Sequence, residues 1–147
     1  SGAIERVIYA LLEKAHLDSL KGAPASLPYW LCPTQVRLVP VSEDYIHHCL
    51  EIAARLPGVR VDIEDTDRTV GKKIRDAEKE WIPYIAVIGE KEAKSGVLTV
   101  RKREAGKPQV EIALDDLISE LRSRQGDMTW DQLGMPLMIS RRAKFVG

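Results

Sequence analysis

Two kinds of hydrophobic repeat divide the chain into a leading helix, a central region of strands and helices, and an aperiodic end. Apolar residues recur at steps of three and four between Ile4 and Ala15, which predicts an amphipathic helix. Gly22 and the prolines that follow it interrupt this pattern and favour a linker. We therefore expect four segments: a helix in 1–22, a linker in 23–34, a folded domain in 35–126 and a tail in 127–147.

The central region alternates between strand-like and helix-like segments. Strands are predicted at 35–41, 59–63 and 84–88, and the segments between them carry apolar residues at helical spacing. This order implies parallel strands joined by right-handed crossovers. Two further strand-like runs, 97–103 and 109–113, flank a turn-forming segment and predict a hairpin, and a last helix follows. The sequence thus predicts an α/β fold with a mixed, roughly five-stranded sheet flanked by helices.

Composition and charge narrow the classes of function without choosing one. The 147 residues include 22 Lys or Arg and 22 Asp or Glu, a balance that excludes a polycationic tail but allows local basic patches. Apolar runs such as 85–88 are far too short to span a membrane, and no signal peptide is visible. Cys32 and Cys49 make no disulfide framework and suit a reducing compartment. We expect a cytoplasmic protein without a membrane partner.

Residue types that carry metal or nucleophilic chemistry are present, but their spacing does not form known sites. No two pairs among His16, His47, His48 and the two cysteines have the separation of zinc ligands. The chain has no nucleophile elbow, Walker loop or glycine-rich dinucleotide turn. The sequence therefore predicts no metal site.

Basic residues follow one side of the second predicted crossover helix. Arg68, Lys72, Arg75 and Lys79 recur at steps of four, three and four, opposite an apolar side that we expect to extend to Trp81. Such a stripe on a neutral protein is a candidate surface for phosphates. On charge alone, an ordinary solvated helix face is the simpler interpretation.

The acidic segment Glu64–Asp67, which precedes that helix, allows two interpretations. Its carboxylates could accept hydrogen bonds from the free amides at the start of the helix, as Ser42 could for the preceding helix. Alternatively, Asp67 could act as an acceptor at the carboxyl end of a parallel strand, where open α/β sheets bind ligands. A hydrolase that uses Asp65 or Asp67 is a weaker alternative, because neither carboxyl lies in an apolar stretch that would raise its pKa.

The hairpin adds a second group of polar side chains. Alternation along its first strand places Thr99, Arg101 and Arg103 on one face and leaves Leu98 for the core. The turn Gly89–Glu92 follows the central strand. An Arg beside a Glu is usually a surface ion pair of little energetic value. The same two groups also recognise base edges in nucleic acids, where Arg donates to acceptor pairs and a carboxylate accepts from N–H groups.

One block of the sequence has a family resemblance. The run Arg68–Glu78, followed by 82–84 and Gly89–Glu92, resembles the class II anticodon-binding domain as found in threonyl-tRNA synthetases, most closely the archaeal type. Ser95-Gly96 and Val100-Arg101 also fit that pattern. The resemblance covers nearly the whole chain and is most specific over this block.

Two stretches outside that block carry the same resemblance. Gly2–Arg6 is similar to the end of motif 3 of the class II catalytic domain, and Pro136-Leu137 with Ser140-Arg141 is similar to the archaeal C-terminal pattern. The resemblance implies that 1–22 is a helix remaining from a catalytic domain and that 35–126 is the anticodon-binding domain. We therefore expect the chain to be the carboxy-terminal part of a longer enzyme.

The resemblance also implies a function. We expect this chain to recognise the anticodon loop of threonine tRNA, so that the full enzyme can attach threonine to it using ATP. The chain itself is expected to be non-catalytic and to hold no cofactor, with ATP, magnesium and zinc in the missing catalytic domain. No DNA partner is expected, and the full enzyme should be a homodimer through its catalytic domain. The alternatives are the same domain from a glycyl-, prolyl- or histidyl-tRNA synthetase, or from an accessory or editing protein.

Individual roles follow from positions that match the family's motifs. Glu92, Arg101 and Asp67 match residues that recognise anticodon bases, although relatives from bacteria have Asn where this chain has Asp67. Arg6 matches the motif 3 arginine that binds ATP in the intact enzyme. Contacts to the tRNA backbone are expected from the basic stripe and the hairpin: Arg68, Lys72, Arg75, Lys79 and Arg103.

Overall fold

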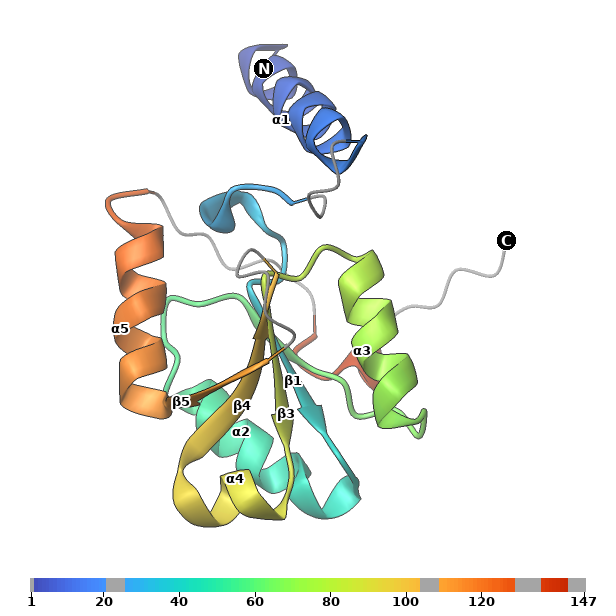
Figure 1. Ribbon diagram of the computed structural model, residues 1–147, viewed down its shortest axis with the longest axis vertical. Helices are drawn as coiled ribbons and strands as arrows, with labels where there is room; N and C mark the ends of the chain where they lie inside the picture. The colour runs from blue at the N-terminus through green and yellow to red at the C-terminus, as the bar shows by residue number, and fades with distance from the viewer. Residues whose placement is uncertain (1, 21–25, 104–108, 129–135, 143–147) are drawn as a thin grey trace.

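Three parallel strands and an antiparallel hairpin form one five-stranded sheet, in the order β2-β1-β3-β4-β5 (Figure 1). The computed structural model describes residues 2–20, 26–103, 109–128 and 136–142. The strands are β1 (Val36–Pro40), β2 (Val61–Ile63), β3 (Tyr84–Ile88), β4 (Val97–Lys102) and β5 (Val110–Ala113). The helices are α1 (Gly2–Leu20), α2 (Ile46–Ala54), α3 (Val70–Lys79), α4 (Glu90–Ser95) and α5 (Leu114–Gln125). Short 3-10 helices lie at η1 (Tyr29–Leu31), η2 (Glu43–Tyr45) and η3 (Ile139–Arg141). The predicted α/β fold with a mixed five-stranded sheet is confirmed.

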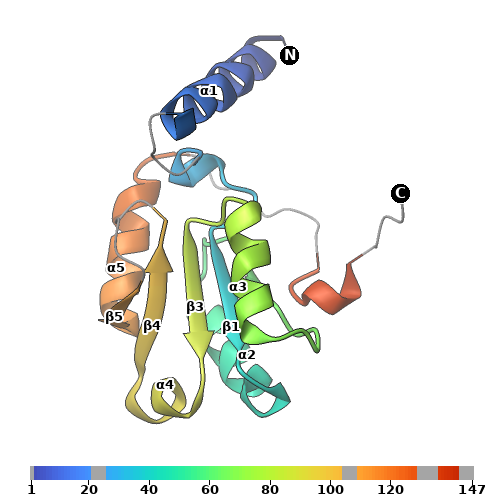
Figure 2. The same ribbon diagram turned by 45° about the vertical axis from the view of Figure 1, so that its right-hand side comes forward.

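Helices cover the two faces of the sheet unequally. On one face α2 and α5 pack over a large cluster of buried residues that includes Leu38, Cys49 and Leu117. On the other face α3 packs through a small cluster in which Ala77 meets Ile85 (Figure 2). Alternate side chains of β4 point to opposite faces of the sheet. Those on the side of α3, Thr99 and Arg101, are half-exposed. This open part of the sheet is where the candidate site lies.

Local geometry differs from the expectation at three turns. Helix α3 ends at Lys79, and Trp81 lies beyond it with φ of 59°, so the expected place of Trp81 on the helix is wrong. The chain must reverse there to enter β3, and the left-handed conformation makes that turn. Ser42 makes no side-chain capping bond, and its carbonyl accepts from Tyr45 instead. The expected turn at Gly89–Glu92 is the start of the short helix α4.

Both ends of the domain pack more tightly than their sequence patterns suggest. Tyr29, in the expected linker, is buried in the main cluster and meets the ring of Tyr84 edge-on, with centroids 6.0 Å apart. In the expected tail, Leu137 and Met138 lie against the outer edge of β2. The division into four segments stays a prediction, because 21–25 and 129–135 lie outside the described residues.

A buried ion pair joins the two strands at that edge. Arg37 on β1 and Asp62 on β2 are each about 1% exposed, and their contacts measure 2.8 Å from Nε to Oδ1 and 3.0 Å from Nη2 to Oδ2. Arg37 also bonds the exposed carboxylate of Glu80 at the end of α3. Thr34 and Arg142 complete the shell of donors around Asp62. Burial alone would lower the pKa of Arg37, but its bonds to the two carboxylates raise it, so the pair stays charged.

Replacing Arg37 tests this pair. We expect Arg37→Met to lower the free energy of unfolding by about 3 kcal/mol, because it leaves the buried Asp62 carboxylate short of its main donor. The loss should lie at the low end of the range for broken buried pairs, since Thr34 and Arg142 still donate to Asp62. Arg55→Met is the matched control: Arg55 pairs with Asp115 on the surface, where a loss within about 1 kcal/mol is expected. Equal losses in urea denaturation would contradict the account.

Candidate nucleic-acid interface

The site is built on the open face of β4. Leu98 and Val100 point into the main cluster and are 2% and 0% exposed. Thr99 and Arg101 therefore point to the opposite face, where both are half-exposed. Ion-pair contact between Arg101 and Glu78 shows that α3 borders this face. The predicted separation of the strand into a core side and a polar side is confirmed.

Glu92 is held over β4 by two hydrogen bonds. It occupies the third position of α4, where its Oε2 accepts from the backbone N–H of Gly89 at 2.9 Å. Its Oε1 accepts from the hydroxyl of Thr99 at 2.8 Å. Burial raises the pKa of Glu92, but these bonds favour the charged form and the net pKa is lowered. The result is an ionised carboxylate in a fixed orientation, with lone pairs left to accept a base N–H.

Two arginines, Arg101 within β4 and Arg103 directly after it, have different surroundings. Arg101 is about one-third exposed, and its Nη1 lies 3.6 Å from Oε1 of Glu78, which is a loose ion pair. Arg103 donates from Nη1 to the backbone carbonyl of Glu78 at 2.8 Å, at the C-terminal end of α3, and burial lowers its pKa. A cation suits that end of a helix. The guanidinium of Arg101 can thus present donors to a ligand, while the contact of Arg103 with a phosphate stays a prediction.

Asp67 lies in the loop between β2 and α3 and is exposed. The N-cap of α3 is Thr69, whose Oγ1 accepts from the N–H of Lys72 at 3.3 Å. Asp67 makes no hydrogen bond or ion pair with any described residue, so the structure does not support the capping interpretation. Asp65 contacts Ser140 through both carboxylate oxygens, which leaves Asp67 as the available acceptor of this loop. No contact joins it to Glu92 or Arg101 within the described part of the chain.

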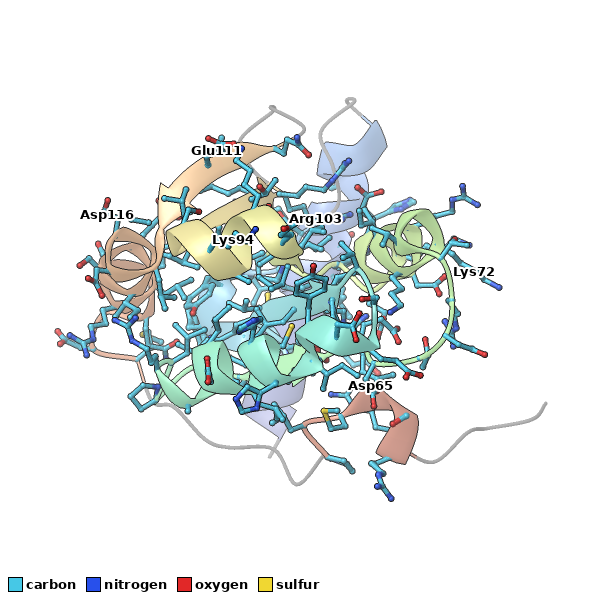
Figure 3. All side chains as sticks on the ribbon, turned by 90° about the horizontal axis from the view of Figure 1, so that it is seen from below. Asp65, Lys72, Lys94, Arg103, Glu111 and Asp116 are labelled. Atoms are coloured by element: carbon cyan, nitrogen blue, oxygen red, sulfur yellow. The ribbon has the colours of Figure 1, made fainter. Side chains whose placement is uncertain are left out.

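The basic stripe lies on the solvent side of α3, as expected. Arg68, Lys72, Arg75 and Lys79 are all exposed, and Arg68 pairs with Asp76. Among the described residues, none pairs with the side chains of the other three. Figure 3 shows Lys72 pointing outward from α3. The outer side of α3 thus carries one cation held by an ion pair and three that no described residue holds.

Arg6 lies far from this site. It is exposed on α1, and Figure 1 shows α1 at the end of the molecule opposite α4. In the described ranges, no three or more His, Cys, Asp or Glu side chains gather in a way that could hold a metal ion. Cys49 is fully buried in the core, and burial raises its pKa to about 12, so it packs as an apolar group. Within the same ranges, no helix is long and apolar enough to cross a membrane.

Comparison with known proteins names the fold. Residues 35–124 match the family described as anticodon binding domain. The chain belongs to this family. The sequence of this chain is 50% identical to that of a threonine–tRNA ligase of Pyrococcus horikoshii, over all of this chain and 24% of that protein. A threonine–tRNA ligase of Cenarchaeum symbiosum is 47% identical, over 97% of this chain and 23% of that protein. The chain thus spans about a quarter of the length of the curated relatives it matches.

A solved structure supports the same assignment. The RNA binding domain of threonyl-tRNA synthetase from Cryptosporidium parvum superposes with a TM-score of 0.63 at 33% identity. The match covers 67% of this chain and 25% of that chain. The expected resemblance to threonyl-tRNA synthetases, mostly of archaeal type, is therefore confirmed for this anticodon-binding domain.

Two residues of the site carry roles that the sequence pattern did not indicate. Thr99 was expected on the open face, but its bond to Glu92 depends on the position of α4. Glu78 contacts Arg101 with its side chain and Arg103 with its backbone carbonyl. Its helical position, one residue after the buried Ala77, places it on a flank of α3, and this was the only available signal.

Removing the Thr99 hydroxyl tests the orientation of Glu92. We expect Thr99→Val to raise the pKa of the Glu92 carboxyl, because the charged form loses a donor. Because the pKa of Glu92 is lower in the folded than in the unfolded state, its carboxylate stabilises the fold at pH values above the unfolded-state pKa. This stabilisation is lost as the pH falls through the folded-state pKa. The destabilisation by Thr99→Val should therefore be larger at neutral pH than in acid. An NMR titration of the Glu92 carboxyl measures the shift directly. Thr69→Val, which removes a hydroxyl at α3, should leave this pKa unchanged, and an equal effect of both variants would refute the assignment.

Proposed function

We propose that this domain binds the anticodon loop of threonine tRNA, as part of an enzyme that attaches threonine to that tRNA using ATP. The observation that supports it best is that the open face of β4 carries both a fixed carboxylate, Glu92 of α4 bonded to Thr99, and a half-exposed guanidinium, Arg101. Relatives that are threonine–tRNA ligases at about 50% identity favour threonine over glycine, proline or histidine as the cognate amino acid.

Base recognition at this face would use complementary hydrogen bonds. The guanidinium of Arg101 can donate two parallel N–H bonds to a pair of acceptors on one base edge. The carboxylate of Glu92 accepts from a ring or exocyclic N–H, and Asp67 can accept but cannot donate. Bases in a loop are unstacked and expose these edges, whereas an RNA duplex hides them in a deep, narrow groove. A single-stranded loop is therefore the form of RNA that fits.

The exposed cations of α3 would position the RNA rather than select its sequence. Lys72, Arg75 and Lys79 carry no partner within the described residues, so their charges are available to phosphates. Such contacts supply salt-dependent affinity and fix the orientation of the loop, while base contacts supply specificity. The zero net charge of the chain is compatible with this, because several cations share the outer side of one helix while charge is balanced over the whole chain.

The remaining roles belong to the proposed whole enzyme. Arg6 would contact ATP there, while magnesium and zinc would bind outside this chain, whose described residues offer no cluster for a metal ion. The whole enzyme would be a cytoplasmic homodimer joined through its catalytic domain. On this proposal, the described domain contributes recognition and no chemical step.

Binding to synthetic stem-loops tests the proposal. We expect the chain to prefer a stem-loop with a threonine anticodon over loops changed at the second or third anticodon base, and we expect Arg101→Ala to abolish that preference. Loss of one base contact should cost about 1–3 kcal/mol, which is several-fold to more than a hundredfold in Kd. Arg122→Ala is the matched control, because Arg122 is exposed on α5, on the other face of the sheet. If all loops bind alike and only salt changes the affinity, the domain does not recognise bases and the proposal fails.

A further inference from the structure

The C-terminal segment Pro136–Arg142 docks along the outer edge of the sheet. The backbone N–H of Ile63 donates to the carbonyl of Leu137 at 3.0 Å, and Ile63 forms a parallel bridge with Met138. The segment therefore extends the sheet beyond β2 by one bridge. This contact lies at Ile63, where β2 ends and the loop that carries Asp67 begins.

Side chains of the segment reach two aspartates around that point. Ser140 donates to Asp65 twice, from its N–H to Oδ1 at 2.9 Å and from its hydroxyl to Oδ2 at 2.6 Å. Arg142 donates to Asp62 at 2.9 Å and to the carbonyl of Pro136 at 3.2 Å, which closes the segment on itself. Figure 3 shows Asp65 directed toward η3. Both oxygens of Asp65 are thus engaged by one residue of the C-terminal segment.

The same loop is held from the inner side by buried groups. Lys73 of α3 is 4% exposed, and its Nζ donates to the carbonyl of Glu64 at 3.0 Å. The Glu64 carboxylate, also buried, accepts from the hydroxyl of Thr66 at 2.6 Å and from its N–H at 3.2 Å. Three consecutive residues before Asp67 are therefore fixed. Asp67 follows them as the exposed carboxylate that no described residue engages.

We propose that Ser140 is a positioning residue for anticodon recognition, acting through Asp65 on the placement of Asp67. A loop held in its binding conformation avoids the ordering cost that a mobile loop would add to binding. Because Ser140 bonds both oxygens of Asp65, it sets the direction in which the chain leaves β2 and turns toward Asp67. The inference rests on the proposed function, in which Asp67 accepts a hydrogen bond from a base.

The experiment is a set of double-mutant cycles on the full chain, with Kd for the threonine-anticodon stem-loop as the readout. We expect Ser140→Ala to weaken binding about three- to tenfold, the usual effect of one hydrogen bond. In an Asp67→Ala background the same change should have no further effect. In an Arg101→Ala background it should keep its full effect, since those two sites share no partner and should act additively.

Controls separate positioning from a general loss of structure. Ser140→Thr keeps the hydroxyl and should bind as the unchanged chain does. Asp65→Ala removes both acceptors of Ser140 and should reproduce the coupling from the other side of the contact, and it serves in place of Ser140→Ala if that variant does not fold. Ser119→Ala removes a serine that bonds Asp115 within α5, and it should leave binding unchanged.

The outcomes are distinct. Unchanged binding by Ser140→Ala, or a loss that persists in the Asp67→Ala background, overturns the positioning role. If Asp67→Ala alone leaves binding unchanged while Arg101→Ala abolishes anticodon preference, the inference fails and the proposed function stands. If Arg101→Ala leaves the preference unchanged, the proposed function itself fails.

Discussion

The alternation of side chains along β4 is the constraint on which the candidate site depends. Leu98 and Val100 must lie in the main core, which commits their neighbours Thr99 and Arg101 to the opposite face. Helix α3 covers β1 and β3 but stops short of β4, so that face stays open to solvent. Polar groups can remain there at little cost in desolvation, and a ligand can reach them. The same strand therefore stabilises the fold on one side and offers hydrogen-bonding groups on the other.

The charged side chains fall into two groups: buried ones that are paired within the fold, and exposed ones that a ligand can reach. Arg37, Asp62 and Lys73 are buried and satisfied by partners from neighbouring elements. The cations on the outer side of α3 are exposed, and Arg101 has only a loose ion pair. A buried charge costs several kcal/mol to leave unpaired, whereas an exposed cation is free to exchange solvent for a phosphate at low cost. A chain of zero net charge can therefore still offer a local basic surface, because these exposed cations lie together on the outer side of one helix.

Much of the fold follows from local patterns, and so could be predicted. The positions of the strands and the two-sided character of β4 depend on periodicities of two and of three to four residues. The burial of Arg37 could not be predicted, because its partners come from β2 and from the end of α3. The left-handed turn at Trp81 also escapes the pattern, since a tryptophan there looks like the next position of an apolar helix face.

The candidate site divides in the same way. Alternation and the family resemblance indicated Arg101 and Glu92, and the structure places both at the open face. The hydroxyl of Thr99 and the docking of Ser140 on Asp65 are contacts between distant segments, the second of them 75 positions apart in the chain. The C-terminal segment has no clean hydrophobic period, because a single bridge and a few side-chain bonds hold it rather than a repeating apolar face.

The measurement that tests the central claim most directly is an NMR map of the isotope-labelled chain with a stem-loop that carries the threonine anticodon. The account predicts that the largest changes in chemical shift fall on Glu92, Thr99, Arg101 and the Asp67 loop, with smaller changes along the outer side of α3. Resonances of α5 should stay in place, because that helix covers the other face of the sheet. Changes centred on α5, or spread evenly over all exposed Lys and Arg residues, would contradict the claim that the open face of β4 is the RNA-binding surface.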